Sequence, residues 1–104
     1  MDGIMLAEIP VANPAVLFRD GPDEGKVMVN CDTGAAIAVN RTGALIWTLI
    51  DGHRNADEIA EEVRRSFRNA PDTVRDDVTA LLITLSKDGF IGYEVQNLTH
   101  NYGK

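Results

Sequence analysis

The sequence contains a single cysteine, Cys31, among its 104 residues. One cysteine excludes a disulfide within the chain and a cysteine-rich zinc site. No apolar run approaches the roughly 18–20 residues that a membrane-spanning helix needs, so a protein anchored by such a helix is excluded. Residues 1–4 lack the basic region followed by a long apolar region that marks a secretory signal. We therefore expect a cytoplasmic protein.

Basic residues are also scarce. Lys and Arg together number 10 against 16 Asp and Glu, which gives a net charge of −6 at pH 7. An acidic chain gains little from nucleic acid or anionic lipid unless its basic residues gather on one face. We therefore expect neither nucleic acid nor a membrane as a partner. The 44% apolar and 25% charged residues are typical of one soluble globular domain.

The first half of the chain has the pattern of three short strands joined by tight turns. β-prone residues occupy positions 16–19. Over 26–31, Val27, Val29 and Cys31 alternate with the other three residues, and over 35–40 the large residues Ile37 and Val39 alternate with alanines. Turn-forming Gly, Pro and Asp gather between these runs, at 20–25 and 32–34. The pattern predicts an antiparallel three-stranded sheet.

Alternation within two of these strands predicts which face is buried. Val27, Val29 and Cys31 form the apolar face of the second strand, which we expect to lie against the core. Cys31 is then a small buried hydrophobic residue rather than a nucleophile with a histidine base. In the third strand Ile37 and Val39 share one face.

The second half has the pattern of three helices. Asn40 is the expected N-cap of the first helix, which ends near Ile50. Asn55 and Glu58 resemble a capping box at the start of the second, and Pro71 lies near the first turn of the third. The apolar stripes are Ala56, Ile59, Ala60, Val63 and Phe67 in the second helix, and Val74, Val78, Leu81, Leu82 and Leu85 in the third.

The order of elements predicts the fold class and the domain boundaries. Gly89 is the expected left-handed C-cap of the third helix, and residues 90–93 form either a short final strand or an apolar plug. We expect an α+β, winged-helix-like fold, with a three-stranded antiparallel sheet followed by three helices. The domain is expected to cover residues 14–95, after an N-terminal extension over 1–13 and before a flexible C-terminal tail over 96–104.

Motifs that suggest catalysis have simpler structural interpretations. Asp32-Thr33-Gly34 matches the catalytic motif of aspartic proteases, but those are nearly all β, whereas this chain is helical after Asn40, so we interpret it as a turn. Neither His53 nor His100 has a second His or a Cys at metal-ligand spacing. The basic cluster at 64–68 is typical of a solvated helix end. We expect no catalytic residue, metal site or cofactor.

A binding module is then the physical default. An open edge of an antiparallel sheet accepts an extended peptide as an extra strand. If residues 37–40 form an edge strand, their free N–H and C=O groups are the template, and a proline at Val39 is expected to remove an edge N–H. The alternative is a winged-helix DNA-binding or structural protein-interaction module, although acids such as Asp76 and Asp77 on the third helix would repel phosphates.

One stretch of the sequence resembles a known family. The chain reads Asn40-x-Thr42-Gly43-Ala44-x-Ile46-Trp47-x-x-x-Asp51-Gly52-x-Arg54-x-x-x-Glu58-Ile59, and later Phe67, Asp76-Asp77-Val78, Leu82, Leu85 and Gly89-Phe90-Ile91. This combination resembles the PqqD family, the small proteins of pyrroloquinoline quinone biosynthesis and their relatives. The resemblance covers roughly residues 14–92.

The resemblance implies a non-catalytic peptide chaperone. Family members bind the leader of a ribosomally made precursor peptide as a strand beside the third strand and against the third helix. They present it to a modifying enzyme, commonly a radical SAM protein. On this chain the resemblance implies a peptide-binding groove built from Ile37, Ala38, Val39, Asn40, Asp77, Ala80, Leu81 and Thr84.

The region before the third strand leaves the pathway open. Members of the quinone pathway typically show a Leu-rich second strand that leads into Pro-Glu-Gly. Here the chain reads Val27-Met28-Val29-Asn30-Cys31-Asp32-Thr33-Gly34. A relative that serves another modified peptide is therefore kept beside the quinone pathway. An exposed strand edge also allows a homodimer, through strand pairing, when no peptide is bound.

Overall fold

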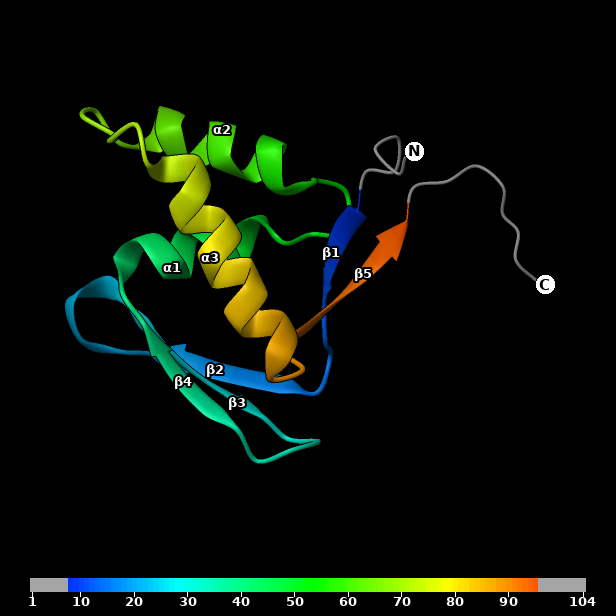
Figure 1. The fold of residues 1–104 in the computed structure, drawn as a ribbon. Helices are drawn as coiled ribbons and strands as arrows, with labels where there is room; N and C mark the ends of the chain where they lie inside the picture. The colour runs from blue at the N-terminus through cyan, green and yellow to red at the C-terminus, as the bar shows by residue number, and fades with distance from the viewer. Residues whose placement is uncertain (1–7, 96–104) are drawn as a thin grey trace.

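The structure is a computed structural model that describes residues 8–95. A three-stranded antiparallel sheet of order β2-β3-β4 carries three helices on one face, and β1 and β5 form a separate antiparallel pair beside them (Figure 1). The elements are β1 Glu8–Ala12, β2 Val16–Asp20, the short 3-10 helix η2 Pro22–Glu24, β3 Lys26–Asn30, β4 Ala36–Val39, α1 Arg41–Leu49, α2 Ala56–Ser66, α3 Val74–Lys87 and β5 Ile91–Val95. The predicted three antiparallel strands followed by three helices are confirmed.

Local capping signals fix where the helices begin and end. The Asn40 side chain accepts a hydrogen bond from the Gly43 N–H at the start of α1 (2.9 Å), as its position predicts. After α3, Gly89 has a φ of 75°, and the Phe90 N–H donates to the Leu85 carbonyl (2.9 Å). The predicted caps at both positions are confirmed.

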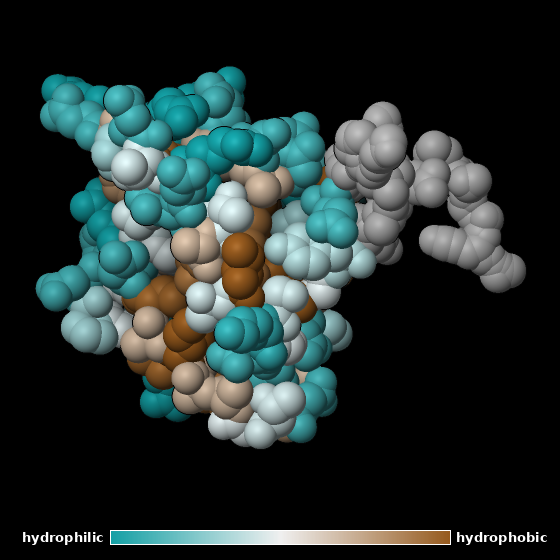
Figure 2. All heavy atoms as spheres, in the orientation of Figure 1, coloured by the Kyte–Doolittle hydropathy of each residue, from teal (hydrophilic) through white to brown (hydrophobic). Residues whose placement is uncertain are grey.

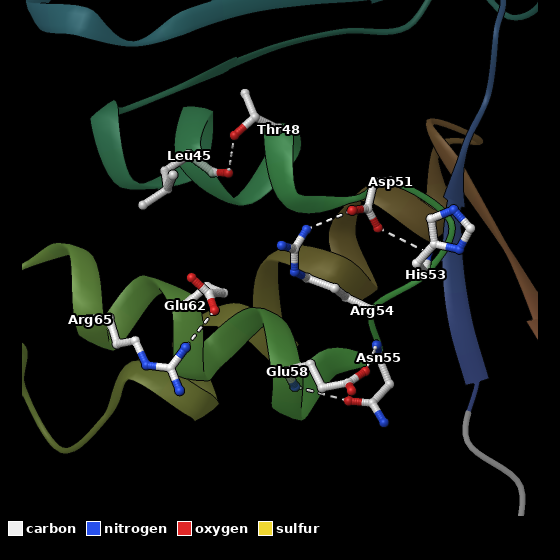
Figure 3. A network of polar contacts seen from close by, with 9 residues as sticks. All are labelled: Leu45, Thr48, Asp51, His53, Arg54, Asn55, Glu58, Glu62 and Arg65. Carbon is white, nitrogen blue, oxygen red and sulfur yellow. Dashed lines mark hydrogen bonds and ion pairs between the residues drawn. The ribbon is translucent and has the colours of Figure 1, made fainter.

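The connection between α1 and α2 is a compact polar network (Figure 3). Asn55 and Glu58 form the predicted capping box, in which each side chain accepts the other residue's N–H at 2.9 Å. Asp51 accepts the His53 N–H (2.9 Å) and pairs with the Arg54 guanidinium (2.6 Å). These bonds set the direction in which α2 leaves α1.

The network predicts that Asp51 makes a pH-dependent contribution to the stability of the fold. The His53 N–H is the main cause that lowers the pKa of Asp51, with a further contribution from the Arg54 charge. A lowered folded-state pKa means that the carboxylate stabilises the fold above about pH 4 and that this contribution disappears as the pH falls through the folded-state pKa. Both side chains are partly exposed, so Asp51→Asn is expected to cost less than about 1 kcal/mol at pH 7.

Chemical unfolding of Asp51→Asn beside the original protein, at pH 7 and near pH 3, measures this contribution. The difference in the free energy of unfolding between the two proteins should be smaller near pH 3 than at pH 7. A difference that stays constant across the range would assign the effect to packing rather than to the charge.

The core lies between the three-stranded sheet and the helices. Trp47 is 8% exposed, and Ile59 and Leu85 are fully buried. The predicted apolar stripes of α2 and α3 supply most of the cluster, with Leu81 and Phe67 only partly buried at its margin. Within residues 8–95, the structure contains no helix with the length and apolar character to cross a membrane.

Residues 8–12 form a strand that the sequence did not indicate. They were expected to belong to the N-terminal extension, but Glu8–Ala12 is β1 and pairs with β5. Ile9 and Pro10 are buried, and β5 shows that residues after Phe90 continue as a strand. The two partners lie about 80 residues apart in the chain, so the pairing leaves no local signal in either segment. The tail over 96–104 lies outside the described residues.

The predicted buried face of β3 is wrong. Met28 and Asn30 are fully buried, whereas Val29 is 37% exposed and Cys31 is exposed. Both faces of this strand carry apolar residues, so alternation alone did not decide between them. The helices determine which face of β3 is buried, because they cover the side of the sheet on which Met28 lies opposite Ile37.

Asn30 is buried because it joins the sheet to the end of α3. Its side-chain Nδ2 donates to the Asp88 carbonyl (2.9 Å), and its Oδ1 accepts the Asp32 N–H (2.9 Å). Asn13 Nδ2 donates to the neighbouring Gly89 carbonyl (3.0 Å). A buried amide is stable only when its polar atoms are paired, and these bonds satisfy that condition. They hold the C-terminal end of α3 over the sheet.

Candidate binding groove

β4 has an open side in the described part of the chain. It pairs with β3 alone, in a sheet whose order is β2-β3-β4. The Asn30 N–H donates to the Ala35 carbonyl (2.8 Å) just before β4. Because hydrogen-bonded pairs alternate along an antiparallel ladder, Ile37 and Val39 also direct their N–H and C=O groups toward β3. The intervening residues of β4 therefore direct theirs to the open side.

Those outward residues are Ala36 and Ala38. Their backbone groups form the template for an added strand, and their small side chains lie on the sheet face away from the helices. The expectation that Val39 offers an edge N–H is wrong. A Cβ built on Gly25 would overlap the Val39 carbonyl oxygen, which independently places that peptide group against β3. Register is decided by the partner strand, so the sequence of β4 could not reveal it.

A groove of about 400 Å³ runs beside this edge, between β4 and α3. We call it the β4–α3 groove. Figure 2 shows apolar side chains gathered across the middle of this face, surrounded by hydrophilic ones. The residues that line the groove are Ile37, Ala38, Val39 and Asn40 at β4, Thr42, Gly43 and Ile46 on α1, and Asp77 and Leu81 on α3.

Six of the eight predicted site residues line this groove, and two do not. Ala80 and Thr84 are exposed on α3 outside its lining, and the Thr84 hydroxyl donates to the Ala80 carbonyl (3.1 Å). The prediction omitted three α1 residues. Of these, Gly43 permits close packing, because a Cβ there would lie 2.7 Å from the Val39 Cβ. The Thr42-Gly43 signal in the α1 motif could have pointed to this wall.

Both the sequence and the fold of this chain resemble those of known proteins. Residues 25–91 match the family model PqqD, described as coenzyme PQQ synthesis protein D. The chain belongs to the PqqD family. Among solved structures it is similar to TbiB1 in complex with the TbiA(beta) leader peptide, with 21% identity and a TM-score of 0.65 over 78% of this chain and 93% of that chain. That likeness establishes the shared fold. No curated protein matches the chain.

In this PqqD-family protein the motifs that suggested other chemistry have structural roles. Asp32 accepts from Asn13 Nδ2 (3.2 Å) in the turn between β3 and β4, where Gly34 has a φ of 82°. Arg64 and Arg65 pair with acids on the same helix. No cluster of three metal-ligating side chains occurs among residues 8–95, and His100 lies outside that range.

The charge of the PqqD-family groove comes from α3. Asp77 is exposed at its wall, and the Thr73 hydroxyl donates to its carboxylate (3.3 Å). The nearby bases Arg41 and Lys26 are engaged with Glu24 and Asp20. The β4–α3 groove therefore combines an apolar floor, unpaired backbone groups along one side and a carboxylate on the other.

Proposed function

We propose that this protein binds the leader of a ribosomally made precursor peptide and presents it to a modifying enzyme of the radical SAM type. The chain itself performs no chemistry in this proposal. The observation that carries it is the open edge of β4, where Ala36 and Ala38 direct backbone groups outward beside the apolar β4–α3 groove. The pathway is pyrroloquinoline quinone biosynthesis or the maturation of another modified peptide.

The geometry defines how the leader would lie. An added strand forms backbone hydrogen bonds to Ala36 and Ala38, and every second side chain turns toward α3. Those side chains meet Leu81 and the floor of the groove, so they are expected to be apolar. A basic residue of the leader would face Asp77. Because the edge and the groove are already formed, the protein loses little conformational entropy on binding.

Co-purification at low salt from the source organism tests this proposal. The tagged full chain should bring down a short precursor peptide together with a radical SAM enzyme, both identified by mass spectrometry. The corresponding synthetic leader should then bind the purified protein in calorimetry. A folded protein that binds duplex DNA with a steep salt dependence, and no peptide, would contradict the proposal and favour the winged-helix DNA-binding alternative.

A further inference from the structure

A second cavity of about 360 Å³ lies where α2, α3 and the start of α1 meet. We call it the α2–α3 cavity. Its walls are mainly apolar, and its polar residues include Arg68, Asn69 and Asp77. Its volume lies within the range of roughly 300–1,000 Å³ that is typical of ligand sites. The apolar residues that line it are Ile46, Val63, Phe67, Ala70, Pro71, Val74 and Val78.

This cavity continues the β4–α3 groove. Thr42, Ile46 and Asp77 line both of them. Thr42 lies in the first turn of α1, directly after β4, Ile46 lies one turn further along α1, and Asp77 lies in the first turn of α3. A peptide paired with Ala36 and Ala38 that extends past the C-terminal end of β4 therefore arrives at the mouth of the α2–α3 cavity.

The walls of the cavity are held in place before any ligand arrives. Val63, Val74 and Val78 are at most 4% exposed and belong to the core. The Arg41 guanidinium stacks over the Phe67 ring, 5.4 Å from its centre, and pairs with Glu24 (3.2 Å). A pocket fixed in this way needs little reorganisation when it accepts an apolar side chain.

Strand addition alone reads little sequence, because backbone hydrogen bonds are the same for every residue type except proline. Selectivity must come from side-chain pockets beside the edge. We propose that the α2–α3 cavity is the anchor pocket for one aromatic or branched aliphatic side chain of the bound peptide, just beyond the segment paired with β4. This inference rests on the proposed function and adds the determinant by which the peptide is chosen.

A displayed library of random linear peptides, selected on the immobilised full chain, tests the pocket. The selected peptides should share one aromatic or branched aliphatic position. Replacing that residue with alanine should weaken binding in calorimetry about 10- to 100-fold, which is the effect of withdrawing a fully buried apolar side chain.

Two protein variants locate the effect. Ala70→Trp places an indole in the cavity. This variant should bind the selected peptide as weakly as the original protein binds the peptide with alanine at the shared position. It should also bind these two peptides with equal affinity. Thr79→Trp is the matched control, because Thr79 is exposed on α3 and lines neither cavity. It should behave like the original protein.

A folded Ala70→Trp that keeps full affinity and still distinguishes the two peptides would overturn the anchor pocket. If Ala70→Trp does not fold, methyl NMR of the original protein decides. An aromatic anchor must then shift the Val63, Val74 and Val78 methyl signals, and unchanged signals overturn the inference. Selected peptides that need the Ala38 N–H but share no apolar position would contradict the anchor pocket and leave the proposed function intact. A selection that yields no peptide overturns the proposed function as well.

Discussion

Ala38→Pro is expected to weaken leader binding about 10- to 100-fold while leaving the melting temperature within a few degrees of the original. The Ala38 N–H points to the open side of β4, so proline removes no hydrogen bond of the folded chain. It removes a donor that the incoming strand would use, and its ring occupies the space of that strand. The preceding residue, Ile37, is already extended, as a residue before proline prefers.

Val39→Pro is the contrasting variant. The backbone groups of Val39 face β3, so proline there removes a bond inside the sheet and is expected to destabilise the fold itself. Calorimetry with the synthetic leader, together with thermal unfolding of both variants, separates the two effects. Undiminished affinity in a folded Ala38→Pro protein would refute strand addition at β4.

Gly25→Ala is expected to destabilise the protein by about 3 kcal/mol and to weaken leader binding with it. The new Cβ would overlap the Val39 carbonyl oxygen and lie 3.2 Å from the Asn40 Cα. Both neighbours are backbone atoms, so no side chain can rotate away, and the cost belongs at the upper end of the usual range for overpacking. Relief requires β4 to move away from β3, which displaces the proposed binding edge.

Gly21→Ala is the matched control for this prediction. Gly21 has a φ of −107°, and a Cβ there would make only ordinary contacts of 3.5 Å. Its expected change in stability is less than about 1 kcal/mol. Urea unfolding of both variants measures the difference between them. Equal stabilities would show that β4 accommodates the methyl group at Gly25 without strain.

The β4–α3 groove shows which residues of a binding site could be predicted from the sequence. The six predicted residues that line it come from β4, from the Asn40 cap that follows it and from α3, and the family resemblance implied their positions. The α1 wall was missed because the resemblance placed the peptide only beside the third strand and against the third helix. The α2–α3 cavity was missed because its walls come from three helices and a loop, and each of them shows only a normal apolar stripe.

The sequence by itself determined the features whose hydrogen-bond partners lie within a few residues. The Asn40 cap, the Asn55–Glu58 capping box and the left-handed Gly89 all follow from local chemistry, and they set the ends of the helices. The family motif is likewise a property of the sequence, and it matches the family model over residues 25–91.

Only the tertiary structure decided which strands pair, which face of β3 is buried and which backbone groups of β4 are free. β1 becomes a strand because β5 reaches it from the other end of the chain. Met28 rather than Val29 is buried because the helices cover that side of the sheet. Ala38 rather than Val39 offers its N–H because β3 fixes the register. Each of these depends on contacts between distant segments, which local patterns do not encode.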